Sequence, residues 1–246
     1  MEKSRIKLDF LVHDLKVPLA VIEAGIQALL QRRDKYGPLT EKQVKVLERA
    51  LRNTIITKTL VNDALELGRS SEGVIYKTPF KLASIVQDTF LEIFDLRDQE
   101  TAERIRECNS LQALKQVLSE RGVFLAVEEQ LWNESFLQDE RKVKQILRNL
   151  LSNALKYRKK RVDIKIERGE KELNIFIKDD GEGIPSRYHK KIFECYFQMD
   201  MEENHCVRGH GVGLAGVLVL LEDMGGEMSL QSDEGKGATF SVKIPV

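Results

Sequence analysis

Three properties are absent from this chain of 246 residues, and each absence excludes a class of protein. The chain has no net charge, because 39 Lys and Arg residues balance 39 Asp and Glu residues, so no overall field attracts nucleic acid or an anionic membrane. No apolar run is long enough to cross a bilayer, and the first residues lack the apolar core of a signal peptide. The three cysteines, Cys108, Cys195 and Cys206, form no even set of disulfides and fit a reducing compartment. We therefore expect a cytoplasmic protein.

The N-terminal region carries two helical repeats. Its first apolar positions recur in alternating steps of three and four residues: Leu8, Leu11, Leu15, Pro18, Ile22, Gly25 and Leu29. A turn at 35–40 ends this helix, and Thr40 with Gln43 can cap a second one. The second repeat is Val44, Leu47, Leu51, Thr54, Lys58, Val61 and Leu65. An antiparallel helical hairpin of this kind cannot enclose a core alone, so we expect a dimeric four-helix bundle.

The pattern changes after 68–73. Alternating apolar residues predict strands at 161–167, 173–179 and 238–244, with helices between them. This arrangement indicates a second domain of the α+β class, in which helices cover one face of a sheet. We place the boundary near 68–76, which gives domains of residues 1–72 and 73–246. The charged segment 94–116 suggests no function, and we expect a solvated helix or a lengthened connection there.

A histidine beside an acid stands out on the first helix. His13 lies two positions from both Leu11 and Leu15, so it points away from the apolar repeat and toward water. Asp14 is about 100° further round the helix, where it can orient the imidazole or accept its proton during attack on an electrophile. Pro18 cannot donate to the carbonyl of Asp14, which loosens or kinks the helix below the histidine. Alone, an exposed histidine on a helix is an ordinary surface residue.

A pair of asparagines marks a later helix. Asn149 and Asn153 are four residues apart on one helix face, and Lys156 follows nearby. Amide oxygens suit Mg²⁺ carried on a nucleotide, and a lysine beside them suits phosphate. Paired asparagines on a helix are nevertheless more often structural or merely exposed.

Three glycine motifs accompany this helix. The sequence DDGEGIP at 179–185 ends a strand with a carboxylate and two glycines, whose backbone a flat ring can approach closely. In RGHGVGLAG at 208–216, glycines precede an apolar helix, so backbone N–H groups and the positive helix end face an anion. EGKGATF at 234–240 is a further glycine turn before the last strand. Each motif alone is weak.

The order of these motifs is far more specific than any one of them. An exposed His-acid-x-x-x-Pro helix is followed by N-x-x-x-N, D-x-G-x-G, IFECYF at 192–197, G-x-G-x-G-L and G-x-G-x-T-F. In this order the chain resembles a sensor histidine kinase over nearly its whole length. The resemblance implies a dimerisation and histidine-phosphotransfer hairpin, followed by an α/β sandwich that binds ATP and is shared with gyrase-type and chaperone ATPases.

The resemblance also implies roles for individual residues. His13 would be the phosphoacceptor and Asp14 its base, while Asn149 and Asn153 would hold Mg²⁺. Asp179 would accept a hydrogen bond from the adenine amino group, and Phe193 with Phe197 would anchor a lid at 198–210. The residues expected to bind the nucleotide are Asn149, Asn153, Lys156, Tyr157, Asp179, Gly181, Gly183, Phe193, Arg208, Gly209, Gly211, Val212, Gly213, Leu214 and Thr239.

The implied activity is ATP-dependent autophosphorylation of His13, followed by transfer of the phosphoryl group to an aspartate of a response regulator. ATP, Mg²⁺, a second copy of the chain and a receiver domain are therefore the expected partners. The chain is then either a kinase driven by a partner or a core cut from a longer protein. Val17 lies four residues after His13, where members that dephosphorylate their regulator often carry threonine or asparagine, so we expect weak phosphatase activity.

Three other interpretations compete with this one. A hydrolytic ATPase of the same fold would place a glutamate where this chain has Asn149, and asparagine is a poor base. A non-catalytic scaffold would be expected to lose the nucleotide motifs, which are all present. A zinc site could use thiol and imidazole ligands, but the spacing matches no standard pair of ligands: Cys195, His205, Cys206 and His210.

Overall fold

The structure is a computed structural model that describes residues 2–70, 74–95, 97–194 and 213–246. The chain divides into two compact units, Met1–Glu72 and Gly73–Val246. Within the described ranges, no helix is both long enough and apolar enough to cross a membrane.

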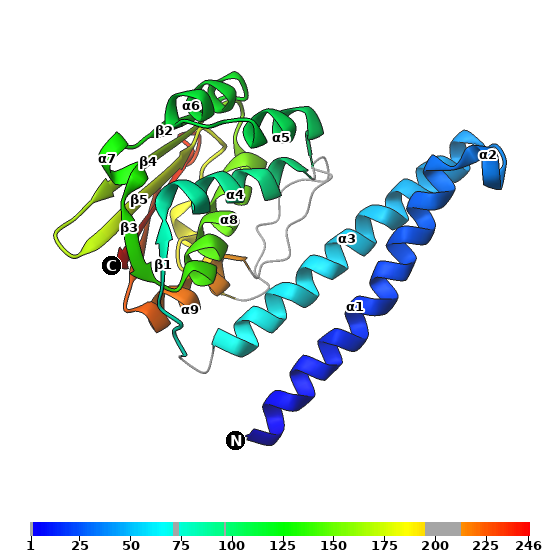
Figure 1. Ribbon diagram of the computed structural model, residues 1–246, viewed down its shortest axis with the longest axis horizontal. Helices are drawn as coiled ribbons and strands as arrows, with labels where there is room; N and C mark the ends of the chain where they lie inside the picture. Colours follow the sequence, from blue (N-terminus) through cyan, green and yellow to red (C-terminus); the bar gives the residue numbers. More distant parts are fainter. Residues whose placement is uncertain (1, 71–73, 96, 195–212) are drawn as a thin grey trace. The chain divides into compact units, whose positions relative to one another are not determined.

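The first unit is an antiparallel helical hairpin (Figure 1). Helices α1 (Glu2–Gln31) and α3 (Glu41–Ser70) lie side by side and are joined through the short helix α2 (Arg33–Tyr36). The N–H of Thr40 donates to Oε1 of Gln43 at 2.9 Å, and the N–H of Gln43 donates to Oγ1 of Thr40 at 3.3 Å, which is a capping box. Helix α1 continues through Pro18. The predicted hairpin is confirmed.

One side of the hairpin leaves apolar side chains in water. In the single chain, Leu15 and Ile22 of the predicted repeat are 43% and 49% exposed, and Val21 beside them is 67% exposed. On α3, in contrast, Thr54 is buried and donates its hydroxyl to the carbonyl of Ala50 at 2.9 Å. The two helices therefore cover only part of their apolar repeats.

The second unit contains a mixed five-stranded sheet. Its strands are β2 (Val123–Ala126), β4 (Val162–Arg168), β5 (Glu172–Asp179), β6 (Glu227–Ser232) and β7 (Ala238–Pro245). They lie in the order β2-β4-β5-β7-β6, and every neighbouring pair is antiparallel except β2 with β4. The three strands expected from the alternation of apolar residues correspond to β4, β5 and β7.

Helices cover one face of this sheet (Figure 1). Helices α8 (Glu140–Tyr157) and α9 (Gly213–Met224) pack on the sheet, and α4 (Leu82–Asp95) packs beside α8. The period of two along β5 explains the layer, because Leu173, Ile175 and Ile177 are buried while Lys178 is exposed on the opposite face. The predicted α+β fold class is confirmed.

Several short elements accompany the main layer. Strands β1 (Thr78–Lys81) and β3 (Ser135–Gln138) form a separate antiparallel pair, in which the rings of Phe80 and Phe136 lie 6.0 Å apart. The short helix α7 (Glu129–Asn133) precedes β3, and two 3-10 turns, η1 (Ser186–Tyr188) and η2 (Lys191–Phe193), follow β5.

The charged segment 94–116 is part of the core, which differs from the solvated helix or connection that we expected. It folds as α5 (Gln99–Arg106) and the start of α6 (Leu111–Glu120), with Asp98 and Ser110 as N-caps. Each helix buries one face, through Thr101, Ala102, Ile105, Leu111 and Leu114. The charges pair on the outer face, where Arg104 donates two hydrogen bonds to Glu120 at 2.6 and 2.9 Å. Composition concealed this amphipathic pattern.

Candidate functional site

Helix α8 presents the two asparagines. Asp139 caps its first turn, and one side of the helix is buried against the sheet through Val143, Ile146, Leu147, Leu150, Leu151 and Ala154. Asn149 and Asn153 are both half-buried. The Nδ2 of Asn149 donates to the carbonyl of Gly213, the first residue of α9, at 3.2 Å. Asn149 is therefore adjacent to the start of α9.

Asp179 ends β5 on the same face as the buried residues Ile175 and Ile177. Its carboxylate is 5% exposed, and Oδ1 accepts hydrogen bonds from the N–H groups of Gly181 at 2.9 Å and Ala238 at 3.4 Å. Desolvation by burial raises the pKa of the Asp179 carboxyl, and these two donors oppose the shift. Among the described residues no donor contacts Oδ2, so one oxygen of a buried carboxylate is available to a ligand.

The adjacent acid has a different task. Asp180 is partly exposed and its carboxylate accepts from three consecutive backbone N–H groups, those of Lys159, Lys160 and Arg161, at 2.9–3.1 Å. Desolvation opposes ionisation, but the three donors together hold the pKa of Asp180 below its usual value. Asp180 thus fixes the connection between α8 and β4, whereas Asp179 faces the inner side of the sheet.

Two glycines allow the loop after Asp179 to lie against neighbouring backbone. A Cβ on Gly181 would lie 2.3 Å from the carbonyl oxygen of Tyr157. Gly183 has φ +73°, and a Cβ there would lie 1.9 Å from the carbonyl oxygen of Asp233. Both positions therefore require glycine because neighbouring backbone lies close to them, which is a different reason from the approach of a flat ring that we expected.

Ser232 joins this loop to the turn between β6 and β7, and no motif in the sequence indicates this role. Its Oγ accepts from the N–H of Ile184 at 2.8 Å and donates to the carbonyl of Gly237 at 2.7 Å. The N–H of Gly235 also donates to the carbonyl of Glu182 at 2.6 Å. These bonds connect segments far apart in the sequence, so only a known strand pairing could have revealed them.

The other predicted residues that the structure describes make contacts of their own. Lys156 donates from Nζ to the hydroxyl of Tyr157 at 2.9 Å, and its ammonium group lies 4.5 Å from the centre of that ring. Leu214 in α9 and Phe193 in η2 pack against the edge of the core. Thr239 is not brought to the site: it pairs with Lys178 on the opposite face of the sheet, and the neighbouring Ala238 contacts Asp179 instead.

Several predicted residues cannot be placed. Arg208, Gly209, Gly211 and Val212 lie outside the described residues, as do Phe197, the lid at 198–210 and all four residues of the zinc hypothesis. Within the described part of the chain, no group of three or more His, Cys, Asp or Glu residues could hold a metal ion. His13 and Asp14 lie in α1, and only their backbone is described.

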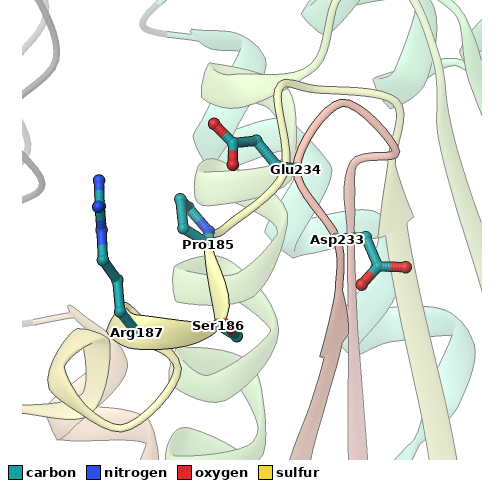
Figure 2. A pocket seen from close by; sticks show the side chains of 5 residues that line it. All are labelled: Pro185, Ser186, Arg187, Asp233 and Glu234. Atoms are coloured by element: carbon teal, nitrogen blue, oxygen red, sulfur yellow. The ribbon is translucent and has the colours of Figure 1, made fainter.

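A surface pocket of about 420 Å³ lies beside the loop that Ser232 holds (Figure 2). It is lined by Pro185, Ser186 and Arg187 from the loop and η1, and by Asp233 and Glu234 from the β6–β7 turn. Figure 2 shows the Asp233 carboxylate turned away from the Arg187 guanidinium. None of the residues predicted to bind the nucleotide lines this pocket, although Asp233 of its lining lies against Gly183.

The fold and this site define a class. A helical hairpin precedes an α/β sandwich that contains two asparagines on one helix, a buried aspartate at the end of a strand and loops that require glycine. Residues 138–246 match the family described as "Histidine kinase-, DNA gyrase B-, and HSP90-like ATPase", and residues 8–73 match the "His Kinase A (phospho-acceptor) domain". The two matches lie side by side along the chain and, with the relatives below, show the catalytic core of a sensor histidine kinase, in which a phosphoacceptor hairpin precedes an ATPase domain.

Individual relatives agree with this assignment. The circadian input-output histidine kinase CikA of Synechococcus elongatus is 29% identical over 237 residues, covering 95% of this chain and 29% of that protein. The sensor histidine kinase WalK of Bacillus subtilis is 26% identical over 239 residues, covering 95% of this chain and 35% of that protein. The chain thus spans about a third of the length of these relatives.

Solved structures share the fold. Full-length ShkA, crystallised in complex with AMPPNP, matches with a TM-score of 0.64 at 22% identity, over 97% of this chain and 45% of that one. The histidine kinase AdeS of Acinetobacter baumannii matches with a TM-score of 0.57 at 18% identity, over 95% of this chain and 97% of that one.

Proposed function

We propose that the chain autophosphorylates His13 from ATP and passes the phosphoryl group to an aspartate of a response regulator. The observation that carries this proposal is the hydrogen bond between Asn149 and the first residue of α9, in a unit that also buries Asp179 and in a chain that also matches a phosphoacceptor domain. The hairpin supplies the acceptor, and the second unit supplies the donor.

Asp179 is the residue that recognises adenine in this proposal. The N–H groups of Gly181 and Ala238 hold Oδ1, so Oδ2 is directed to the ligand and can accept from the exocyclic amino group. A Cβ on Gly181 would lie 2.7 Å from Oδ1 of Asp179, so glycine there keeps a side chain away from the carboxylate and lets a flat ring lie close to the backbone.

Asn149 and Asn153 suit a magnesium ion carried on the nucleotide. The Nδ2 of Asn149 is engaged by the carbonyl of Gly213, which leaves Oδ1 as the group available to a hard cation. When bound, Mg²⁺ would neutralise charge on the β- and γ-phosphates. The same hydrogen bond joins Asn149 to the start of α9. Backbone N–H groups and the helix dipole at a helix start suit phosphate oxygens.

The hairpin provides the nucleophile. An imidazole nitrogen of His13 would attack the γ-phosphorus, forming a P–N bond as the bond to the bridging oxygen of ADP breaks. Asp14 would accept the imidazole proton or orient the ring for attack. The competing hydrolytic reaction needs a base near the nucleotide, and the amide of Asn149 cannot supply one.

The hairpin also forms a homodimer in this proposal. Leu15 and Ile22 continue the apolar repeat of α1 but are 43% and 49% exposed in the single chain. Two hairpins that bring these faces together would complete a four-helix bundle and remove the apolar surface from water. A receiver domain would dock on the outside of that bundle, near His13.

Labelling with γ-labelled ATP and Mg²⁺ tests the activity. We expect the wild type to acquire acid-labile, base-stable phosphate, and His13→Gln to acquire none while keeping its nucleotide affinity. Labelling of His13→Gln would show that another residue is the acceptor. Release of inorganic phosphate by both proteins at equal rates, without labelling, would instead support the hydrolytic ATPase.

A further inference from the structure

A buried carboxylate connects the segment that enters the second unit to the helix that carries both asparagines. Asp139 is 4% exposed and lies between β3 and α8. Its Oδ1 accepts from the N–H of Lys142 at 3.2 Å, which is the N-cap of α8. Its Oδ2 accepts from the N–H of Tyr76 at 3.0 Å, 63 residues earlier in the chain.

The hydrogen bond from Tyr76 holds the segment that connects the hairpin to the second unit. Residues 74–77 have no regular secondary structure and lie between α3, which ends at Ser70, and β1. The Tyr76 side chain is 68% exposed, so it is the backbone N–H and not the ring that fixes this segment. The position of the chain where it arrives from the hairpin is therefore tied to the first turn of α8.

Neighbouring bonds hold Asp139 in place. The N–H of Asp139 donates to Oε1 of Gln138 at 3.0 Å, and Nε2 of Gln138, itself 1% exposed, donates to the carbonyl of Pro245 at 2.7 Å. A buried polar group with all its partners is rigid, and the loss of one partner is costly. Asp139 is therefore anchored to the end of the sheet as well as to α8.

The connection extends to the second helix of the site. Nζ of Lys142 forms an ion pair with Asp223 at 2.7 Å, and both side chains are 11% exposed. Asp223 belongs to the last turn of α9, whose first residue, Gly213, accepts from Asn149. Helix α9 is thus joined to α8 at both of its own ends, and Asp139 links that pair to the entering segment.

We propose that Asp139 is a positioning residue for phosphoryl transfer, which holds the segment arriving from the hairpin at a fixed place on α8. This inference rests on the proposed function. If the bond to Tyr76 is lost, the entering segment gains freedom and the phosphoacceptor samples more positions relative to the nucleotide. The effective concentration of His13 at the γ-phosphoryl group then falls, while the nucleotide site keeps its own contacts.

Two substitutions remove the same bond from opposite sides. Tyr76→Pro deletes the donor and leaves the cap of α8 intact. Asp139→Asn has a single acceptor oxygen and can keep only one of the two bonds, and asparagine is as good an N-cap as aspartate. Tyr76→Ala is the matched control, because it removes the exposed ring and keeps the N–H.

The test uses the full chain and measures the autophosphorylation rate at saturating Mg-ATP, nucleotide affinity and hydrogen exchange of the Tyr76 amide. We expect the rate to fall about tenfold in Tyr76→Pro and in Asp139→Asn, with affinity within about twofold of the wild type. The double variant should be no slower than the slower single variant, because both changes remove one bond. Tyr76→Ala should match the wild type in rate, and its amide should stay protected, whereas Asp139→Asn should lose that protection.

The outcomes separate this inference from the function on which it rests. Wild-type rates in both Tyr76→Pro and Asp139→Asn would overturn it while leaving the kinase activity established. A rate loss explained entirely by weaker nucleotide affinity, or additive losses in the double variant, would overturn it as well. A wild-type chain that binds nucleotide but never labels would overturn the proposed function itself.

Discussion

The two units of this chain bury apolar surface in different ways. The second unit encloses a continuous core between its sheet and helices. Hydrogen bonds within the same chain hold Asp179 and the loop that follows it. The hairpin leaves Leu15, Val21 and Ile22 in water, although two of these belong to its apolar repeat. The described residues around Asp179 are thus held by contacts within a single chain, whereas the proposed function assigns the exposed apolar surface of the hairpin to a second copy. Changes in one unit should therefore leave the property of the other unchanged.

The largest expected effect breaks the hairpin side of this comparison. Burying an isoleucine contributes about 1.5–3 kcal/mol, and a symmetric interface buries it twice, so Ile22→Glu should weaken self-association by at least about 100-fold. Val46→Glu is the control, because Val46 is 56% exposed on α3 but lies outside the predicted repeat. Sedimentation measures association, and calorimetry should find nucleotide affinity unchanged in both variants. Dissociation caused by Val46→Glu and not by Ile22→Glu would place the interface on another face.

The next largest effect is a loss of stability in the second unit. Gly183→Ala would combine an unfavourable φ of +73° with a Cβ 1.9 Å from the Asp233 carbonyl oxygen. Gly235→Ala meets the same restriction at φ +80° but has nothing within 4 Å of its Cβ. The control should lose about 1–2 kcal/mol of unfolding free energy, and Gly183→Ala about 1–3 kcal/mol more. Denaturant unfolding measures both, and equal losses would show that the loop yields without strain.

The same comparison explains which features of the fold and the site could be predicted from the sequence. Repeats with a fixed period, such as the heptads of the hairpin and the alternation in β5, depend only on near neighbours, so they could be predicted. That alternation also distinguishes Asp179, which follows Ile175 and Ile177 on the inner face, from the adjacent Asp180. The expectation for Thr239 rests on a glycine motif and ignores the alternation of inward and outward residues along the strand. Thr239 pairs with Lys178 and lies on the outer face.

Other features depend on contacts between distant segments. Ser232 and Asp139 act on backbone groups far away in the chain, and neither stands in a recognisable motif. The amphipathic faces of α5 and α6 are a different case, because the buried Leu111, Leu114 and Leu118 recur at helical spacing and depend only on near neighbours. The high charge of this segment drew attention away from that period, so the sequence does contain the signal.

A smaller effect is expected from substitutions of the two adjacent acids, Asp179 and Asp180, which test where adenine binds. Asp179→Asn removes a charged acceptor, so nucleotide affinity should fall by about 10- to 100-fold, the equivalent of about 1.5–3 kcal/mol. Asp180→Asn should leave affinity nearly unchanged and lower the unfolding free energy by about 1 kcal/mol, because it weakens a carboxylate that accepts three backbone N–H groups. Normal affinity in Asp179→Asn would show that adenine binds elsewhere.

The pH dependence of the two acids should have opposite signs. The folded pKa of Asp179 is raised above 3.8, so its contribution to stability is present below that value and is lost as the pH rises through the folded pKa. The folded pKa of Asp180 is lowered, so its contribution is present above 3.8 and is lost as the pH falls through the folded pKa. Unfolding of the two Asn variants across this range, compared with the wild type, measures each contribution separately. Curves of the same sign would contradict these environments.

The smallest effect concerns the hairpin alone and a second activity. Val17 is 53% exposed in the single chain and lies one helical turn after His13, so its side chain does not pack inside the hairpin. A valine cannot orient a hydrolytic water against the phospho-aspartate of a docked receiver, so the wild type should be a weak phosphatase. Val17→Thr adds a hydroxyl at this position and should accelerate dephosphorylation severalfold, up to about tenfold. Nucleotide affinity should not change.

A matched variant makes this last prediction specific. Val21→Thr places the same hydroxyl one turn further along α1, at a residue that is 67% exposed and too far from His13 to reach the same water. The measurement follows loss of phosphate from a phosphorylated cognate regulator with ADP or no nucleotide, so that rephosphorylation does not contribute. Acceleration by Val17→Thr alone would assign the effect to geometry beside the phosphoacceptor. Rapid dephosphorylation by the wild type, unchanged by either threonine, would mean that the residue at this position does not set the activity, and that the hydrolytic water is held by the receiver itself.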